Sequence, residues 1–148
     1  MKHIWSVLCN KSIIDTDSNL ISLIDCIEEI NFSQDISKNN EIKDKLILPI
    51  SLQIVNFWLI EKNDSNKLNI KIEIIGPENT KIQEITGDFE IQNNYKRYRT
   101  RININGIHIL GGGRYYLNVY FRTNKIKDFD KASELPLDVN LNYKINNK

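Results

Sequence analysis

Alanine and methionine are almost absent from this chain of 148 residues, which contains only Ala132 and Met1. The scarcity of alanine removes the residue with the highest helix propensity. In its place stand 26 isoleucines, which favour pleated, half-buried surfaces, and 20 asparagines, which favour turns over helix interiors. The composition therefore predicts an all-β protein.

Other shortages exclude classes of function. Cys9 and Cys26 are too few for a disulfide framework or a zinc site, and His3 and His108 have neither metal spacing nor an adjacent acid. No apolar run approaches the roughly 20 residues of a membrane-spanning helix, and the first residues are too polar for a secretory signal. A net charge of +1 provides no long-range attraction to nucleic acid or acidic membranes. We therefore expect a soluble, cytoplasmic protein with no cofactor and no membrane partner.

The apolar pattern predicts the fold class. Leu68, Ile70, Ile72 and Ile74 alternate with polar residues, as the side chains of a half-buried strand do. Similar alternation runs through residues 114–123 and 135–143, and turn residues separate the runs. We expect a single domain over residues 1–148, an antiparallel β-sandwich of about seven to nine strands, immunoglobulin-like or C2-like. The same pattern leaves a barrel open.

The first 61 residues leave several alternatives open. Two apolar runs, 4–14 and 20–30, predict a hairpin with Cys9 and Cys26 on one face, although residues 20–30 also fit a helical stripe. The polar stretch 33–45 predicts either a crossover between sheets or a mobile loop with a short helix. Residues 46–61 predict a long strand with a bulge, or burial on both faces, near Val55.

Residues 85–103 predict a second hairpin with Asn93 and Asn94 at its tip, because asparagine tolerates the positive φ of a tight turn. The resulting register brings opposite charges together on one face and apolar side chains together on the other. It pairs Glu90 with Arg97, Asp88 with Arg99, Phe89 with Tyr98, and Ile85 with Ile102.

Three segments of the chain resemble a group of small bacterial β-sandwich proteins catalogued only as a domain of unknown function. They are SNLISLIDCIEEI, PISLQIVNFWLIEKNDSNKLNIKIEIIGPEN and GGGRYYLNVYFRTNKI. The resemblance covers most of the chain and rests on strand and turn patterns. It implies a β-sandwich and implies no activity or site residues. The polar stretch 33–45 departs from the usual family pattern.

Three loop motifs are interpreted as structural. Gly111–Gly113 runs into a strand rather than a helix, so it predicts a bend that lets another backbone approach and not a phosphate loop. Asn105-Gly106 predicts a turn. The acidic cluster at residues 15–19 lacks the glycine and glutamate that a helical calcium loop requires.

Two groups of residues are candidates for binding. Lys96, Arg97, Arg99 and Arg101 resemble a nucleic-acid-binding strand, and they are the candidate site for an anion or nucleic acid. The favoured interpretation is a solvated face neutralised by Asp88 and Glu90, with Arg101 the least neutralised. Tyr116, Tyr120 and Arg122 share the outer face of one strand and are the candidate protein interface.

No group of residues in the sequence forms a recognisable catalytic constellation. We therefore expect a non-enzymatic binding or scaffold module whose partner is a protein, either a second copy of the chain or another protein. The alternative is anion or nucleic-acid binding through residues 95–101.

Overall fold

The computed structural model describes residues 1–37, 46–61, 64–92 and 95–146. These residues form nine strands and one short 3-10 turn, η1 (Pro77–Asn79). The strands are β1 (Lys2–Ile14), β2 (Ile21–Cys26), β3 (Glu29–Ser37), β4 (Leu46–Leu59), β5 (Lys67–Ile75), β6 (Lys81–Glu90), β7 (Arg97–Ile109), β8 (Gly113–Thr123) and β9 (Ile126–Asn146). Among the described residues, no helix is long and apolar enough to cross a membrane.

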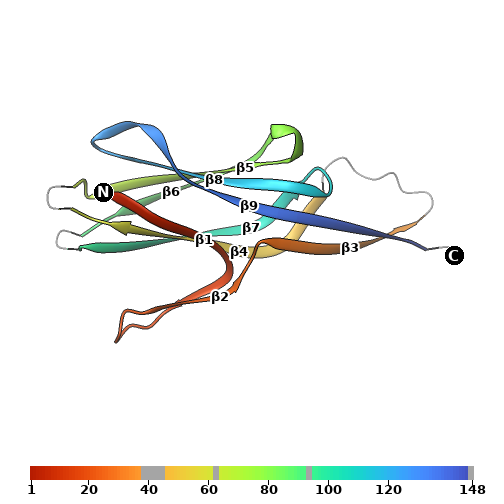
Figure 1. Ribbon diagram of the computed structural model, residues 1–148, viewed down its shortest axis with the longest axis horizontal. Coiled ribbons are helices and arrows are strands. Elements are labelled where there is room, and N and C mark those ends of the chain that lie inside the picture. Colours follow the sequence, from red (N-terminus) through yellow and green to blue (C-terminus); the bar gives the residue numbers. More distant parts are fainter. Residues whose placement is uncertain (38–45, 62–63, 93–94, 147–148) are drawn as a thin grey trace.

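The strands form two sheets that pack face to face as a sandwich (Figure 1). The first sheet has the strand order β2-β1-β4-β7, and the second has the order β3-β9-β8-β5-β6. The predicted all-β sandwich of seven to nine strands is therefore confirmed. Its pairing is mixed rather than fully antiparallel, because β3 runs parallel to β9. The helical alternative for residues 20–30 is wrong, since β2 and the start of β3 occupy this segment.

The core lies between the two sheets and follows the predicted alternation. Leu68, Ile70, Ile72 and Ile74 of β5 are fully buried, and Trp58 of β4 is among the largest buried side chains. Val55 is also fully buried although its neighbour Ile54 points into the core. Of the two predictions for this part of β4, burial on both faces is therefore correct, and the register shift against β7 lies earlier, between Leu48 and Ser51.

Two loop predictions require correction. The stretch 33–45 begins with strand, since β3 extends to Ser37; residues 38–45 lie outside the described part of the chain. The prediction of a crossover agrees with the placement of β3 and β4 in different sheets. Asn105-Gly106 is not a turn but lies inside β7, near the register shift against β4. Gly106 has a φ of 80°, and this positive φ is part of the irregularity in the strand at the register shift.

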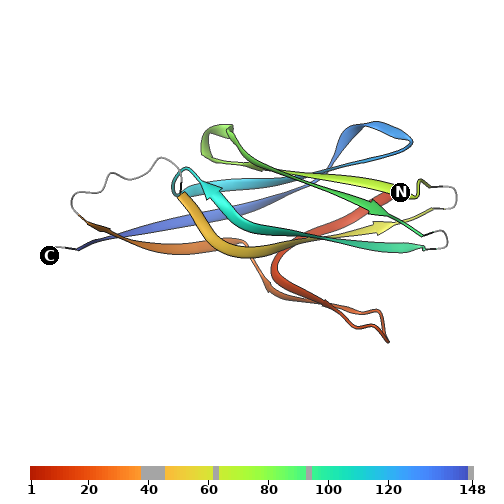
Figure 2. The same ribbon diagram turned by 180° about the vertical axis from the view of Figure 1, so that it is seen from behind.

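The predicted first hairpin is present in shortened form. β1 pairs with β2, and Cys9 lies directly opposite Cys26. After Cys9, β1 leaves β4 and continues with β2 as a two-stranded ribbon that bends away from the first sheet (Figures 1 and 2). The ribbon stays attached because the Ser12 N–H and hydroxyl both donate to Gln53 Oε1, at 2.7 and 2.8 Å.

The glycine cluster before β8 confirms the predicted close approach of two backbones. A Cβ atom on Gly112 would lie 3.3 Å from the Val139 carbonyl oxygen and 3.6 Å from the Leu141 nitrogen. A side chain at this position would push the β9 backbone away by a few tenths of an ångström, so glycine favours this close passage.

Candidate functional site

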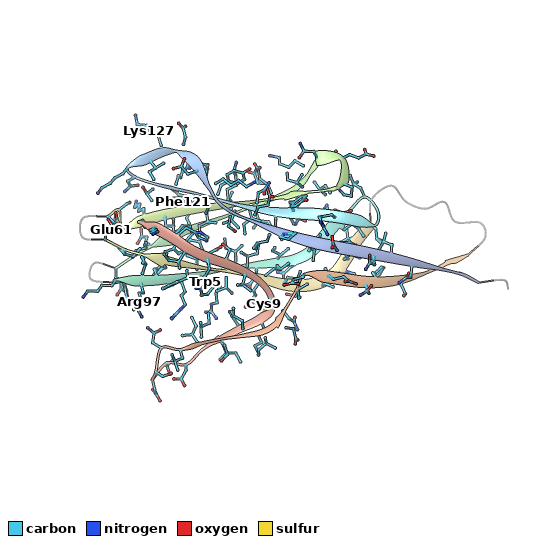
Figure 3. The ribbon with its side chains drawn as sticks, in the orientation of Figure 1. Trp5, Cys9, Glu61, Arg97, Phe121 and Lys127 are labelled. Atoms are coloured by element: carbon cyan, nitrogen blue, oxygen red, sulfur yellow. The ribbon has the colours of Figure 1, made fainter. Side chains whose placement is uncertain are left out.

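The basic segment lies on β7, at the edge of the first sheet. β7 pairs with β4, and directly opposite residues of an antiparallel pair point to the same face. The register sets Arg97 opposite Leu59, Arg99 opposite Phe57, and Arg101 opposite Val55. Arg97, Arg99 and Arg101 therefore form one line on the outer face of the first sheet, which we call the arginine row. Figure 3 shows the positions of Arg97 and Trp5 in this sheet.

The predicted hairpin between β6 and β7 is wrong, and its tip at residues 93–94 lies outside the described residues. β6 belongs to the second sheet, where it pairs with β5 and sets Glu90 opposite Lys67. Glu90 and Arg97 thus lie on opposite outer faces of the sandwich. Alternation specifies only which side chains face inward, and two strands in facing sheets satisfy it as well as a hairpin does.

The arginine row consequently lacks the acidic partners that the sequence predicted for it. Within the described ranges, neither Lys96 nor any member of the row forms an ion pair. Lys96, Arg97 and Arg101 are exposed, and Arg99 is half-buried. The outer face at β7 therefore carries uncompensated positive charge.

Arg99 is held in place by contacts that the sequence did not predict. Its Nη1 donates to the backbone oxygen of Asn19 at 3.1 Å and to Asn19 Oδ1 at 3.2 Å. Its guanidinium lies over the Phe57 ring, 5.8 Å from the ring centroid, and the Trp5 ring packs against Phe57 with 5.6 Å between the ring centroids. Arg99 Nε is buried and has no hydrogen-bond partner among the described residues. These residues come from three distant strands and a turn, so no local pattern could have revealed the cluster.

The backbone of β7 also has unused hydrogen-bonding groups. The Ile60 N–H donates to the Lys96 carbonyl oxygen at 3.0 Å, so these two residues form a hydrogen-bonded pair. Such pairs alternate along an antiparallel ladder. The N–H and C=O groups of Arg97, Arg99 and Arg101 therefore point away from β4, toward an edge that no other described strand covers.

The edge of the second sheet at β6 also has unused backbone hydrogen-bonding groups, and it carries acidic side chains in place of arginines. The Ile91 N–H donates to the Asn66 carbonyl oxygen at 2.7 Å, which sets the alternation along β5 and β6. The residues of β6 whose backbone groups point to the free edge are Glu84, Thr86, Asp88 and Glu90. All four are exposed. Glu84, Asp88 and Glu90 form the acidic row.

The candidate interface of Tyr116, Tyr120 and Arg122 lies on the outer face of the second sheet, on β8. The structure brings Tyr120 and Arg122 together under Phe129, from the start of β9. Lys71 Nζ lies 4.8 Å from the Tyr120 ring centroid and 5.0 Å from that of Phe129, and the Arg122 guanidinium lies 4.6 Å from the Phe129 ring. Phe129 therefore occupies part of the surface that a partner would use.

A pocket of about 420 Å³ lies beside β1, β8 and β9 and is lined in part by Leu8, Cys26, Arg114 and Asp138. Arg114 forms a bidentate ion pair with Asp138, at 2.7 and 2.9 Å, which holds the pKa of the Asp138 carboxyl below its usual value. Burial raises the pKa of the Cys9 thiol, opposite Cys26 in the register, so Cys9 packs as a small apolar side chain.

One buried polar network joins a histidine to a serine, an arrangement that the sequence gave no reason to expect. His3 Nε2 lies 2.8 Å from Ser6 Oγ, and the Ser6 hydroxyl donates to Asn56 Oδ1 at 2.6 Å. Since the hydroxyl proton points to Asn56, His3 Nε2 is the donor to Ser6 and cannot remove that proton. Burial lowers the pKa of His3, which favours the neutral ring. The arrangement is a structural network and not an activated nucleophile.

In comparisons with known proteins, no family model matches the chain and no curated protein matches it. The resemblance noted in the sequence therefore stays a prediction. Within the described ranges, no group of three or more His, Cys, Asp or Glu side chains could hold a metal ion.

Proposed function

We propose that the protein is a non-enzymatic binding module that engages a protein partner by strand addition at β7. The supporting observation is that the charge and the open backbone groups belong to the same residues, Arg97, Arg99 and Arg101. An extended partner strand forms main-chain hydrogen bonds with such an edge. Its side chains opposite the arginine row are acidic, because cross-strand neighbours of opposite charge stabilise the pair.

The test uses a labelled octapeptide of alternating glutamate and threonine, with a lysine–threonine octapeptide as the matched control. Fluorescence anisotropy should detect binding of the acidic peptide only, and binding should weaken as salt is added. Arg101→Ala should weaken it, because Arg101 is exposed and forms no ion pair within the described ranges. Equal binding of both peptides would contradict the proposal, and so would binding of neither peptide by protein that is monomeric at the concentration used.

The second candidate function is anion or nucleic-acid binding through Lys96, Arg97, Arg99 and Arg101. It is favoured because none of the four forms an ion pair among the residues that the structure describes. A thymidine oligonucleotide needs the charges but not the open backbone edge. Asn103→Pro removes an edge N–H without touching a backbone hydrogen bond to β4. Asn103→Ala is its control, because both variants lose the side-chain hydrogen bond from Gln53 Nε2 to Asn103 Oδ1. Loss of peptide binding in the proline variant alone supports strand addition. Oligonucleotide binding that survives in both variants, without peptide binding, supports the second function.

A further inference from the structure

Two of the four edge strands of the sandwich, β6 and β7, lie on the same side of the molecule. β6 and β7 are consecutive strands, each at the end of its sheet, and they contact one another across the sandwich. The His108 N–H donates to Gln83 Oε1 at 3.4 Å, which joins the two edges. Figure 2 shows the two strands running in opposite directions beside each other. One side of the sandwich thus presents an acidic edge in one layer and a basic edge in the other.

From this arrangement we infer that the partner at β7 is a second copy of the chain, which docks β6 in a two-fold symmetric dimer. The inference rests on the proposed function and identifies its partner. A two-fold axis parallel to the strands and midway between the sheets places β6 of each copy beside β7 of the other. Both sheets then continue from one copy into the next, and the new strand pairs are antiparallel.

The register of this dimer follows from the connection between the two strands. Glu90 ends β6 and Arg97 begins β7, so both lie at the same end of the sandwich. The rotation therefore brings Glu90 of one copy opposite Arg97 of the other. Further along the strands it brings Asp88 opposite Arg99 and Thr86 opposite Arg101. The residues in these pairs are the ones whose backbone groups point to the open edges.

The inner faces of the two strands match in the same register. Phe89 comes opposite Tyr98 and Ile85 opposite Ile102. The first three of these side chains are only partly buried at the edge of the core. A second copy would extend the core over them and remove apolar surface from water. The complementarity that the sequence presented as a hairpin within one chain is therefore satisfied between two chains.

The charges also exclude the competing edge pairings. β7 against β7 would set arginines opposite arginines, and β6 against β6 would set carboxylates opposite carboxylates, which destabilises a strand pair. Of the pairings between the β6 and β7 edges, only β6 against β7 places unlike charges together. Because each copy provides one strand of each kind on the same side, the contact closes at two copies and does not grow into a fibre.

Glu90→Lys and Arg97→Glu test the dimer, since neither side chain forms an ion pair or a side-chain hydrogen bond within the described part of its own chain. Sedimentation equilibrium of the unmodified protein should give a dimer that dissociates on dilution. Each variant alone places like charges together in both layers, and should weaken the dimer by about tenfold or more. Far-ultraviolet circular dichroism checks that both variants fold.

An equimolar mixture of the two variants provides the decisive measurement. In a mixed dimer Lys at position 90 meets Glu at position 97 in one layer, and Glu90 meets Arg97 in the other, so both layers are attractive again. The mixture should form dimers although each variant alone does not. Unmodified protein that stays monomeric, variants that dimerise normally, or a mixture that stays monomeric would each overturn the inference. If a variant fails to fold, Asn103→Pro replaces it and should also reduce dimerisation.

The acidic octapeptide separates failure of the dimer from failure of the proposed function. Glu90→Lys leaves β7 open in a monomer, so this variant should bind the peptide. A monomeric unmodified protein that binds the peptide would overturn the dimer and leave strand addition in place. A monomeric protein that binds no peptide would overturn both.

Discussion

At the scale of single residues, His3, Ser6 and Asn56 satisfy one another inside the sandwich. The chain of hydrogen bonds continues from Asn56 Nδ2 to Thr100 Oγ1 at 3.1 Å, and the Trp58 indole N–H donates to the same hydroxyl at 3.2 Å. Buried polar groups are costly when they have no partner, so this network specifies how β1, β4 and β7 align. Its chemistry supports a structural role because the Ser6 hydroxyl proton is already directed to Asn56 Oδ1.

The position of His3 predicts a pH dependence of stability. Burial lowers the pKa of His3 below its ordinary value of 6.5, so in the interval between the two pKa values the unfolded chain binds a proton that the folded protein does not. The contribution of His3 to stability is therefore complete above about pH 6.5 and is lost as the pH falls through that interval.

Urea unfolding at about pH 7.5 and about pH 5.5 measures this effect. The free energy of unfolding of the unmodified protein should fall on acidification, and His3→Gln, whose amide can still donate to Ser6, should show a smaller fall. His108→Gln is the control at an exposed position and should keep the full dependence. An equal fall in all three proteins would contradict the assignment to His3.

At the scale of the elements, patterns in the sequence predicted strands well and their neighbours poorly. The alternation in β5 predicted the strand and its buried face, because a strand covered on one side must alternate. The pairing of β6 was wrong for a physical reason. Residues 85–103 satisfy the same inward and outward pattern in one sheet or in two, and the choice depends on distant strands, β5 and β4, that local spacing does not reveal. The Arg99 cluster was missed for the same reason, since Asn19, Phe57 and Arg99 meet only through the register.

The irregularity in β7 leads to a prediction for Gly106. Its φ of 80° lies in the left-handed region, which costs a residue with a side chain about 1–2 kcal/mol. A Cβ at this position would also lie 3.2 Å from Ile47 Cγ2, a distance that requires a small shift. Gly106→Ala should therefore lower the free energy of unfolding by about 1–2 kcal/mol in urea titrations.

Asn105→Ala serves as the neighbouring control for Gly106→Ala. Asn105 accepts an exposed hydrogen bond from the Ser51 hydroxyl at 3.0 Å, and such bonds contribute little. If both variants lost the same small amount of stability, the positive φ of Gly106 would make no measurable contribution to the free energy of unfolding.

At the scale of the whole molecule, the sandwich ends differently on its two sides. On one side β3 pairs in parallel with β9, and this pairing joins the first third of the chain to the last strand. On the same side the ribbon of β1 and β2 bends away from the first sheet. On the other side β6 and β7 end their sheets with open backbone groups and opposite charges. Open edges invite pairing with another chain unless charge or cover prevents it. Here the charges on one edge complement those on the other, so the fold favours a closed pair of copies over an indefinite assembly.

A closed dimer predicts that thermal stability depends on protein concentration. Unfolding then separates two copies, so each tenfold increase in concentration stabilises the dimer by about 1.4 kcal/mol. Divided by the unfolding entropy of two such chains, this corresponds to a rise in the melting temperature of about 2 °C for each tenfold increase. Scanning calorimetry over a hundredfold range of concentration should detect this rise in the unmodified protein.

The Glu90→Lys variant should melt at the same temperature throughout that range, because its copies repel one another. The equimolar mixture of Glu90→Lys and Arg97→Glu should recover the concentration dependence, since both layers of the mixed dimer are attractive. Recovery cannot arise within one chain, because positions 90 and 97 lie on opposite outer faces of the sandwich. A melting temperature that is independent of concentration in the unmodified protein would mean that β6 and β7 do not join two copies.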